Sequence, residues 1–186
     1  MNVAKVHQSR AGFTLVELMI VIAIMAILAG IAYPLMLSWL PNMRLRGAAR
    51  DVYSVMQRAR AEAIERGVDV TVGFSTATDA YILFLDNGAG GNTGNDVLDA
   101  DEPALLRSGP LPEGVAFDDR AAPPAPLIAI KGADGIVDGV SFAGNTLVFT
   151  PRGLPVGIGG TVALWVPATG RQRTVTVSIA GRVRMQ

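Results

Sequence analysis

The hydrophobic pattern divides the chain into an apolar stretch, an amphipathic stretch and a series of short alternating runs. No charged residue occurs from position 18 to position 43, which is 26 positions. At about 1.5 Å per residue, a helix of this length could cross a hydrocarbon core of about 30 Å. The pattern therefore predicts a membrane-spanning helix, which we place at residues 13–41. Pro34 and Pro41 lie inside it and predict an irregular region between residues 34 and 42.

The next stretch, residues 42–66, has the period of an amphipathic helix. Its apolar positions recur every three or four residues and are Leu45, Ala49, Val52, Met56, Ala59 and Ala63. The opposite face carries Arg46, Arg50, Arg58, Arg60, Glu62 and Glu65. Glu62 and Arg66 form a favourable i, i+4 pair, and Gly67 is placed to cap the helix end. We expect the apolar face to pack on a globular domain and the charged face to lie in solvent.

Short β-branched and aromatic runs after Gly67 indicate strands. The first two, at residues 68–74 and 81–85, are separated by a polar turn and predict a hairpin. Further candidates lie at residues 114–117, 127–130, 140–142, 147–150, 161–166 and 173–179. A helix followed by strands predicts an α+β fold, with a mostly antiparallel sheet packed on the second half of the long helix. This globular domain is bounded at residues 42–186.

The first twelve residues carry Lys5 and Arg10 and no acid, which predicts a cytoplasmic N-terminus. An ordinary secretory signal and a plain membrane anchor are two alternative interpretations. Alanines spaced by three leave no A-x-A cleavage site at the end of the apolar run. Glu17 interrupts the start of that run, where neither alternative accounts for an acid, because an acid in lipid is costly.

The segment Gly12-Phe13-Thr14-Leu15-Val16-Glu17-Leu18 resembles the processing and methylation motif of type IV prepilins and type II secretion pseudopilins. The resemblance implies that a prepilin peptidase cuts after Gly12 and methylates Phe13 as the first residue of the mature chain. It also implies that Glu17 pairs with the N-terminal amine of a neighbouring subunit, which makes an acid tolerable in lipid. Residues 1–12 are then a leader peptide.

The implied location is the inner membrane, crossed once, with a cytoplasmic N-terminus and a periplasmic C-terminal domain. After assembly the chain lies in a pilus or pseudopilus, and its partners are other pilins or pseudopilins. The order of elements over residues 44–186 is similar to the FimT/GspH group, with an arginine-bearing helix, an acidic loop and a terminal pair of strands. This implies a pilin fold and a minor pilin of a type IV pilus. A minor pseudopilin of a type II secretion system, acting in protein export, is the alternative.

The final hairpin carries a local basic cluster, with Arg171 and Arg173 at its turn and Arg182 and Arg184 near the C-terminus. Strand alternation puts Arg182 and Arg184 on one side, where two guanidinium groups could bridge adjacent phosphates. In FimT-like minor pilins of natural transformation, a terminal G-R-x-R resembling residues 181–184 is implicated in DNA binding. All four arginines are therefore candidate DNA contacts. A charged edge strand that resists aggregation is the competing interpretation.

Composition removes most enzyme classes. The 186 residues include no cysteine, and the one histidine, His7, lies in the predicted leader, so thiol catalysis and a histidine-based triad are excluded from the mature chain. We expect no enzyme and no cofactor. The loop 86–102 holds five acids that would suit a hard cation, but their spacing does not match an EF-hand, so a solvated loop is favoured and no metal is expected. Loss of the leader leaves fourteen basic against sixteen acidic residues, which predicts modest and salt-dependent DNA affinity.

Overall fold

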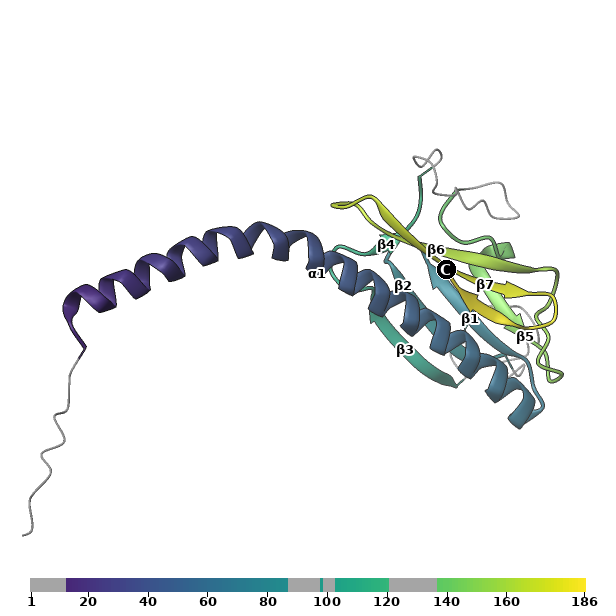
Figure 1. Cartoon of the computed structure of the whole chain (residues 1–186). Helices are drawn as coiled ribbons and strands as arrows, with labels where there is room; N and C mark the ends of the chain where they lie inside the picture. The colour runs from purple at the N-terminus through teal and green to yellow at the C-terminus, as the bar shows by residue number, and fades with distance from the viewer. Residues whose placement is uncertain (1–12, 87–97, 99–102, 121–136) are drawn as a thin grey trace, which may run out of the picture. The chain divides into compact units, whose positions relative to one another are not determined.

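The computed structural model describes residues 13–86, 98, 103–120 and 137–186 (Figure 1). The chain divides into two compact units, Met1–Trp39 and Leu40–Gln186, and the first helix contributes to both. The elements in chain order are α1 (Leu15–Arg66), β1 (Val70–Ser75), β2 (Ala80–Leu85), β3 (Ala104–Pro110), β4 (Ala116–Phe117), the 3-10 helix η1 (Ala143–Asn145), β5 (Thr146–Phe149), β6 (Gly159–Val166), β7 (Arg171–Ser178) and β8 (Val183–Met185).

The first unit consists of the apolar part of α1. Leu15–Tyr33 has a mean hydropathy of 2.7 and none of its residues is buried, so by length and composition it is able to cross a membrane. The helix continues through Pro34 and Pro41 without a break. The irregular region predicted between residues 34 and 42 is therefore not an interruption of the helix. Each proline removes one backbone donor from this part of the helix.

The apolar face of α1 in the second unit is the one predicted from the sequence. All six predicted positions, from Leu45 to Ala63, are at most 2% exposed. Ala48 and Val55 widen the buried stripe. The helix ends as expected, because Gly67 has a φ of 69° and its N–H donates to the carbonyl oxygen of Ala63 over 3.0 Å.

The charged face of α1 is confirmed at most of its positions. Arg46, Arg50, Arg58 and Glu65 are exposed, and Nε of Arg66 donates to Oε2 of Glu62 over 2.6 Å. This hydrogen bond is the main reason why the pKa of Glu62 lies below its ordinary value. The pair therefore stabilises the fold above the ordinary glutamate pKa, and its contribution is lost as the pH falls through the lowered pKa. Arg60 and Glu62 were expected in solvent and are half-buried instead.

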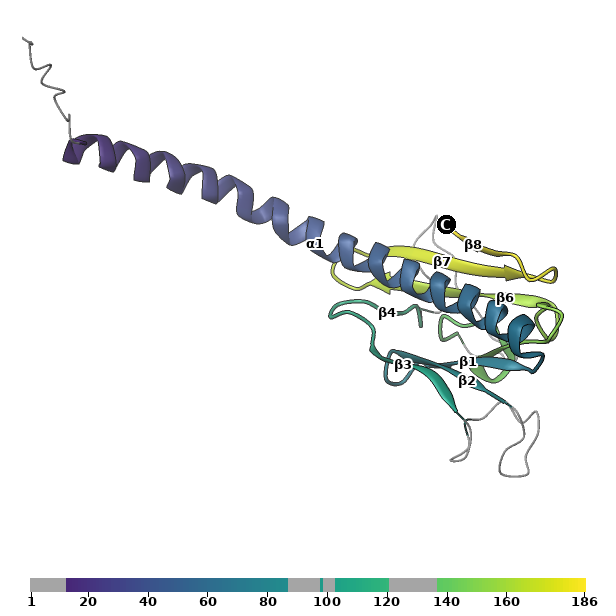
Figure 2. The same ribbon diagram turned by 90° about the horizontal axis from the view of Figure 1, so that it is seen from below.

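The strands form two four-stranded sheets, with orders β3-β2-β1-β5 and β4-β6-β7-β8, and all their strand pairs are antiparallel. The predicted hairpin is present, since β1 and β2 pair from Val70↔Leu85 to Ser75↔Ala80. Figure 2 shows the second half of α1 running along both sheets. The predicted α+β fold with antiparallel pairing is confirmed, with two sheets in place of one.

The edge strand β3 was missed by the sequence analysis. Its segment contains Gly109 and ends at Pro110, residues that weaken a strand pattern. An edge strand tolerates them, and its pairing with β2 shifts register twice. Of the other candidates, residues 140–142 contribute only an isolated bridge from Val140 to Val162, and residues 127–130 lie outside the described residues.

One hydrophobic core joins α1 to both sheets. Phe74 of β1 lies at their junction, where its ring meets Phe117 edge-on at 6.1 Å and stacks on Phe142 at 6.1 Å. Val162, Leu164, Val175, Val177 and Val183 turn the inner face of the second sheet toward this core. The alternate residues of the same strands therefore form an outer face, away from the core.

Candidate assembly and anion-binding sites

The N-terminal site residues lie at the start of α1. The N–H of Glu17 donates to Oγ1 of Thr14 over 3.2 Å, so Thr14 caps the helix and Glu17 occupies its third position. The spacing T-x-x-E is that of a capping box, which can be read from the sequence alone. An acid in the first turn is also favoured by the helix dipole. Phe13 and Glu17 are exposed, and Gly12 lies outside the described residues.

The two C-terminal arginines lie on the edge strand β8. Val177 pairs with Val183 and Thr176 pairs with Arg184. Val183 is 5% exposed and belongs to the core, whereas Arg182 and Arg184 are both exposed. The structure thus gives the alternation expected from the sequence. Both arginine side chains project from the outer face of the second sheet. Neither forms an ion pair with any acid that the structure describes.

Arg171 and Arg173 are not on this outer face. In β7 they alternate with Gln172 and share the side of Val175 and Val177, which points to α1. They line a shallow hollow together with Asn42, Leu45 and Arg46 of the helix. The structure therefore separates the predicted four-arginine cluster into two pairs on opposite faces of the sheet.

The turn before β8 is fixed by a three-way contact that the sequence did not reveal. Nε of Arg60 donates to the carbonyl oxygen of Gly153 over 3.0 Å. Gly181 lies directly against that carbonyl group, and a Cβ added to Gly181 would also lie 3.2 Å from Nε of Arg60. Gly153 and Gly181 both have positive φ, at 70° and 71°. Helix α1 thus holds the turn from which Arg182 and Arg184 extend.

Replacing Gly181 with alanine is expected to destabilise the fold by about 2–4 kcal/mol, because the new methyl group combines a left-handed backbone with a clash against Gly153. Gly170→Ala is the matched control, since Gly170 has a φ of 65° and no atom within 4 Å of an added Cβ. It should cost only the backbone term of about 1–2 kcal/mol. Urea unfolding of the two variants compares them, and equal losses would contradict the three-way contact.

A buried ion pair stands on the outer face at the other end of β6. The carboxylate of Asp118 is fully buried and accepts from Nε and Nη2 of Arg120, each over 2.7 Å, and from Nε2 of Gln172 over 2.6 Å. The guanidinium carbon of Arg120 lies 4.0 Å from the ring centre of Trp165. The hydrogen bonds to Asp118 raise the pKa of Arg120. This group fixes the segment after β4 on the sheet.

The predicted acidic loop lies outside the described residues except at Asp86, which is buried, and at residue 98. Within the described ranges, no group of three or more His, Asp or Glu side chains is placed to hold a metal ion.

Two family models match this chain. The family model described as type II transport protein GspH matches residues 48–181, and the prokaryotic N-terminal methylation motif matches residues 7–33. The pilin-like protein PilA1 of Thermus thermophilus is 34% identical over 139 residues, which cover 65% of this chain and 84% of the relative. The type IV minor pilin FimU of Pseudomonas aeruginosa has a similar fold, with a TM-score of 0.50 and 16% identity over 78% of this chain and 90% of FimU.

Proposed function

Because the chain belongs to the GspH family of pilins and pseudopilins, we propose that it is a minor pilin of a type IV pilus. Family members assemble with other pilins or pseudopilins. In this proposal a prepilin peptidase of the inner membrane cuts after Gly12, and the new N-terminus at Phe13 is methylated. The apolar half of α1 then passes from the membrane into the filament, while residues 42–186 lie in the periplasm.

The observation that supports assembly is the apolar surface of Leu15–Tyr33, none of which is buried within the chain. Lipid covers such a helix before assembly, and the helices of neighbouring subunits cover it afterwards. In cells that make the filament, we expect the processed chain in the sheared pilus fraction. Its absence from that fraction, with all of the processed chain retained in the membrane, would contradict the proposal.

A type II secretion pseudopilus is the second candidate, and it is supported by the description of the matching family model. The two candidates differ in the expected effect of deleting the gene. Loss of pili with normal protein export is the result that the type IV proposal predicts. Normal pili with impaired export would support the pseudopilin instead.

DNA binding is a second function that we propose for the filament subunit. Arg182 and Arg184 are exposed on one face of an edge strand, about 6.6 Å apart by strand geometry, and are able to contact successive phosphates. The Arg60–Gly153–Gly181 contact fixes the backbone turn that precedes these two arginines.

The double change Arg182→Ala, Arg184→Ala is expected to weaken binding of the full chain to DNA roughly tenfold or more at low salt. The slope of log affinity against log salt should fall by about 1 for each arginine. Arg171→Ala, Arg173→Ala removes the same charge from the opposite face and should change both quantities much less. Fluorescence anisotropy in detergent micelles measures them. Equal effects of the two double variants would assign the affinity to net charge alone.

A further inference from the structure

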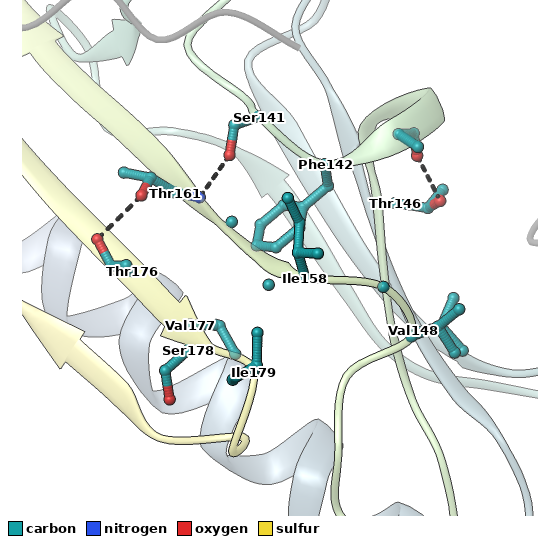
Figure 3. A pocket seen from close by; sticks show the side chains of 15 residues that line it. Ser141, Phe142, Thr146, Val148, Ile158, Thr161, Thr176, Val177, Ser178 and Ile179 are labelled. Atoms are coloured by element: carbon teal, nitrogen blue, oxygen red, sulfur yellow. Dashed lines mark hydrogen bonds between the residues drawn. The ribbon is translucent and has the colours of Figure 1, made fainter. Parts of the chain in front are cut away.

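A pocket of about 810 Å³ opens beside β6 and β7 (Figure 3). The strands contribute Thr161, Thr176 and Ser178 to the lining. Oγ1 of Thr161 lies 3.0 Å from that of Thr176, and Oγ of Ser178 accepts from the N–H of Arg182 over 3.2 Å. The facing segments contribute the apolar side chains of Phe142 and Ile158, together with the hydroxyl groups of Ser141 and Thr146. Ile158 is 88% exposed at the mouth. The volume is in the range of small-ligand pockets. Exposed apolar side chains at the mouth of a pocket are typical of a ligand-binding surface.

The strand register connects this pocket to the two C-terminal arginines. Thr176 pairs with Thr161 on one side and with Arg184 on the other, and the N–H of Ser178 donates to the carbonyl oxygen of Arg182 over 3.0 Å. Residues directly opposite each other in an antiparallel pair project from the same face. Both arginines therefore project from the same face of the sheet as Thr161 and Thr176. They lie on the strand next to β7, at a spacing of about 4.8 Å.

The chemistry of the pocket complements that of its neighbours on β8. None of the fifteen residues that line it carries a charge. A ligand seated there is thus an uncharged group with an apolar face and a polar edge, and any anion attached to it lies outside, where Arg182 and Arg184 are exposed. A nucleobase with its flanking phosphates has this distribution of groups.

We propose that the pocket takes an unpaired nucleobase of a DNA strand whose neighbouring phosphates lie on Arg182 and Arg184. This inference rests on the proposed DNA-binding function and specifies its substrate. The hydroxyl-bearing residues Thr161 and Thr176 meet the polar edge of the base, and the side chains of Phe142 and Ile158 cover its ring. A base inside a duplex is stacked and paired and does not enter such a pocket without being extruded. The site therefore prefers single-stranded DNA to duplex DNA.

The test measures binding of the full chain in detergent micelles to three fluorescent probes. These are a single-stranded oligonucleotide, the same strand with abasic sites, and its duplex. The intact strand should bind about tenfold more tightly than the abasic strand, since both carry the same phosphates and only one offers a base. Thr176→Phe fills the pocket and should remove this difference. Thr176→Val, which loses the same hydroxyl group without filling the pocket, should keep most of it.

Thr174→Phe is the control for size, because Thr174 lies on the same face of β7 and outside the pocket lining. It should bind the intact strand as the unaltered chain does. Equal affinity of the unaltered chain for intact and abasic strands, with loss of both on Arg182→Ala, Arg184→Ala, would overturn the pocket and leave the arginine site standing. Unchanged affinity in that double variant would overturn both proposals.

Discussion

Replacing Arg120 with alanine is expected to destabilise the second unit by about 3–5 kcal/mol, as measured by urea unfolding. Asp118 is fully buried and receives two hydrogen bonds from the Arg120 guanidinium group. Without Arg120 the carboxylate stays buried with Gln172 as its remaining side-chain donor among the described residues. A buried charge left without its counterion is far more costly than the pair itself is stabilising.

The double variant Asp118→Asn, Arg120→Ala separates the ion pair from simple loss of packing. Removing the negative charge should restore part of the stability lost in Arg120→Ala, although the contact with Trp165 stays lost. Arg184→Ala, at an exposed position, should change stability by no more than about 0.5 kcal/mol. A loss below about 1 kcal/mol in Arg120→Ala would show that the Asp118 pair does not hold this segment on the sheet.

Replacing Glu17 with glutamine is expected to reduce incorporation of the chain into filaments at least tenfold, while the chain remains in the membrane. Glutamine occupies the third position of a capping box as well as glutamate does, so the start of α1 is preserved. The change removes only the charge that, in the proposed assembly, pairs with the N-terminal amine of a neighbour. Immunoblots of sheared filaments and membranes measure the two populations.

Glu17→Asp is the matched control, because it keeps the charge on a shorter side chain and should retain part of the incorporation. If Glu17→Gln enters filaments as well as the unaltered chain does, the acid acts only through the helix start. The capping geometry at Thr14 would then be its whole role.

The helix was predictable from the sequence because its burial repeats with the helical period. The apolar residues Leu45, Ala49, Val52 and Met56 lie on one face of a helix, and the structure buries that face. Proline did not mark a helix end here, since neither Pro34 nor Pro41 interrupts α1. The edge strand β3 was not predicted, because an edge strand needs fewer hydrogen bonds to its neighbours and tolerates glycine and proline.

The candidate DNA site was predictable within one strand and not between strands. Alternation along residues 182–184 correctly gave two exposed arginines around a buried valine. Proximity in sequence wrongly grouped them with Arg171 and Arg173. Arg184 pairs with Thr176, so it shares a face with the even-numbered residues of β7 and not with these two arginines. Arg60 was expected in solvent, and its bond to Gly153 depends on a contact across 93 positions that no local pattern contains.

The mass of the N-terminal peptide from purified filaments tests whether the chain is cut after Gly12 before it assembles. We expect a peptide that begins at a methylated Phe13 in filaments, and an uncut chain in cells that lack the prepilin peptidase. A chain in functional filaments that still carries residues 1–12 would contradict it.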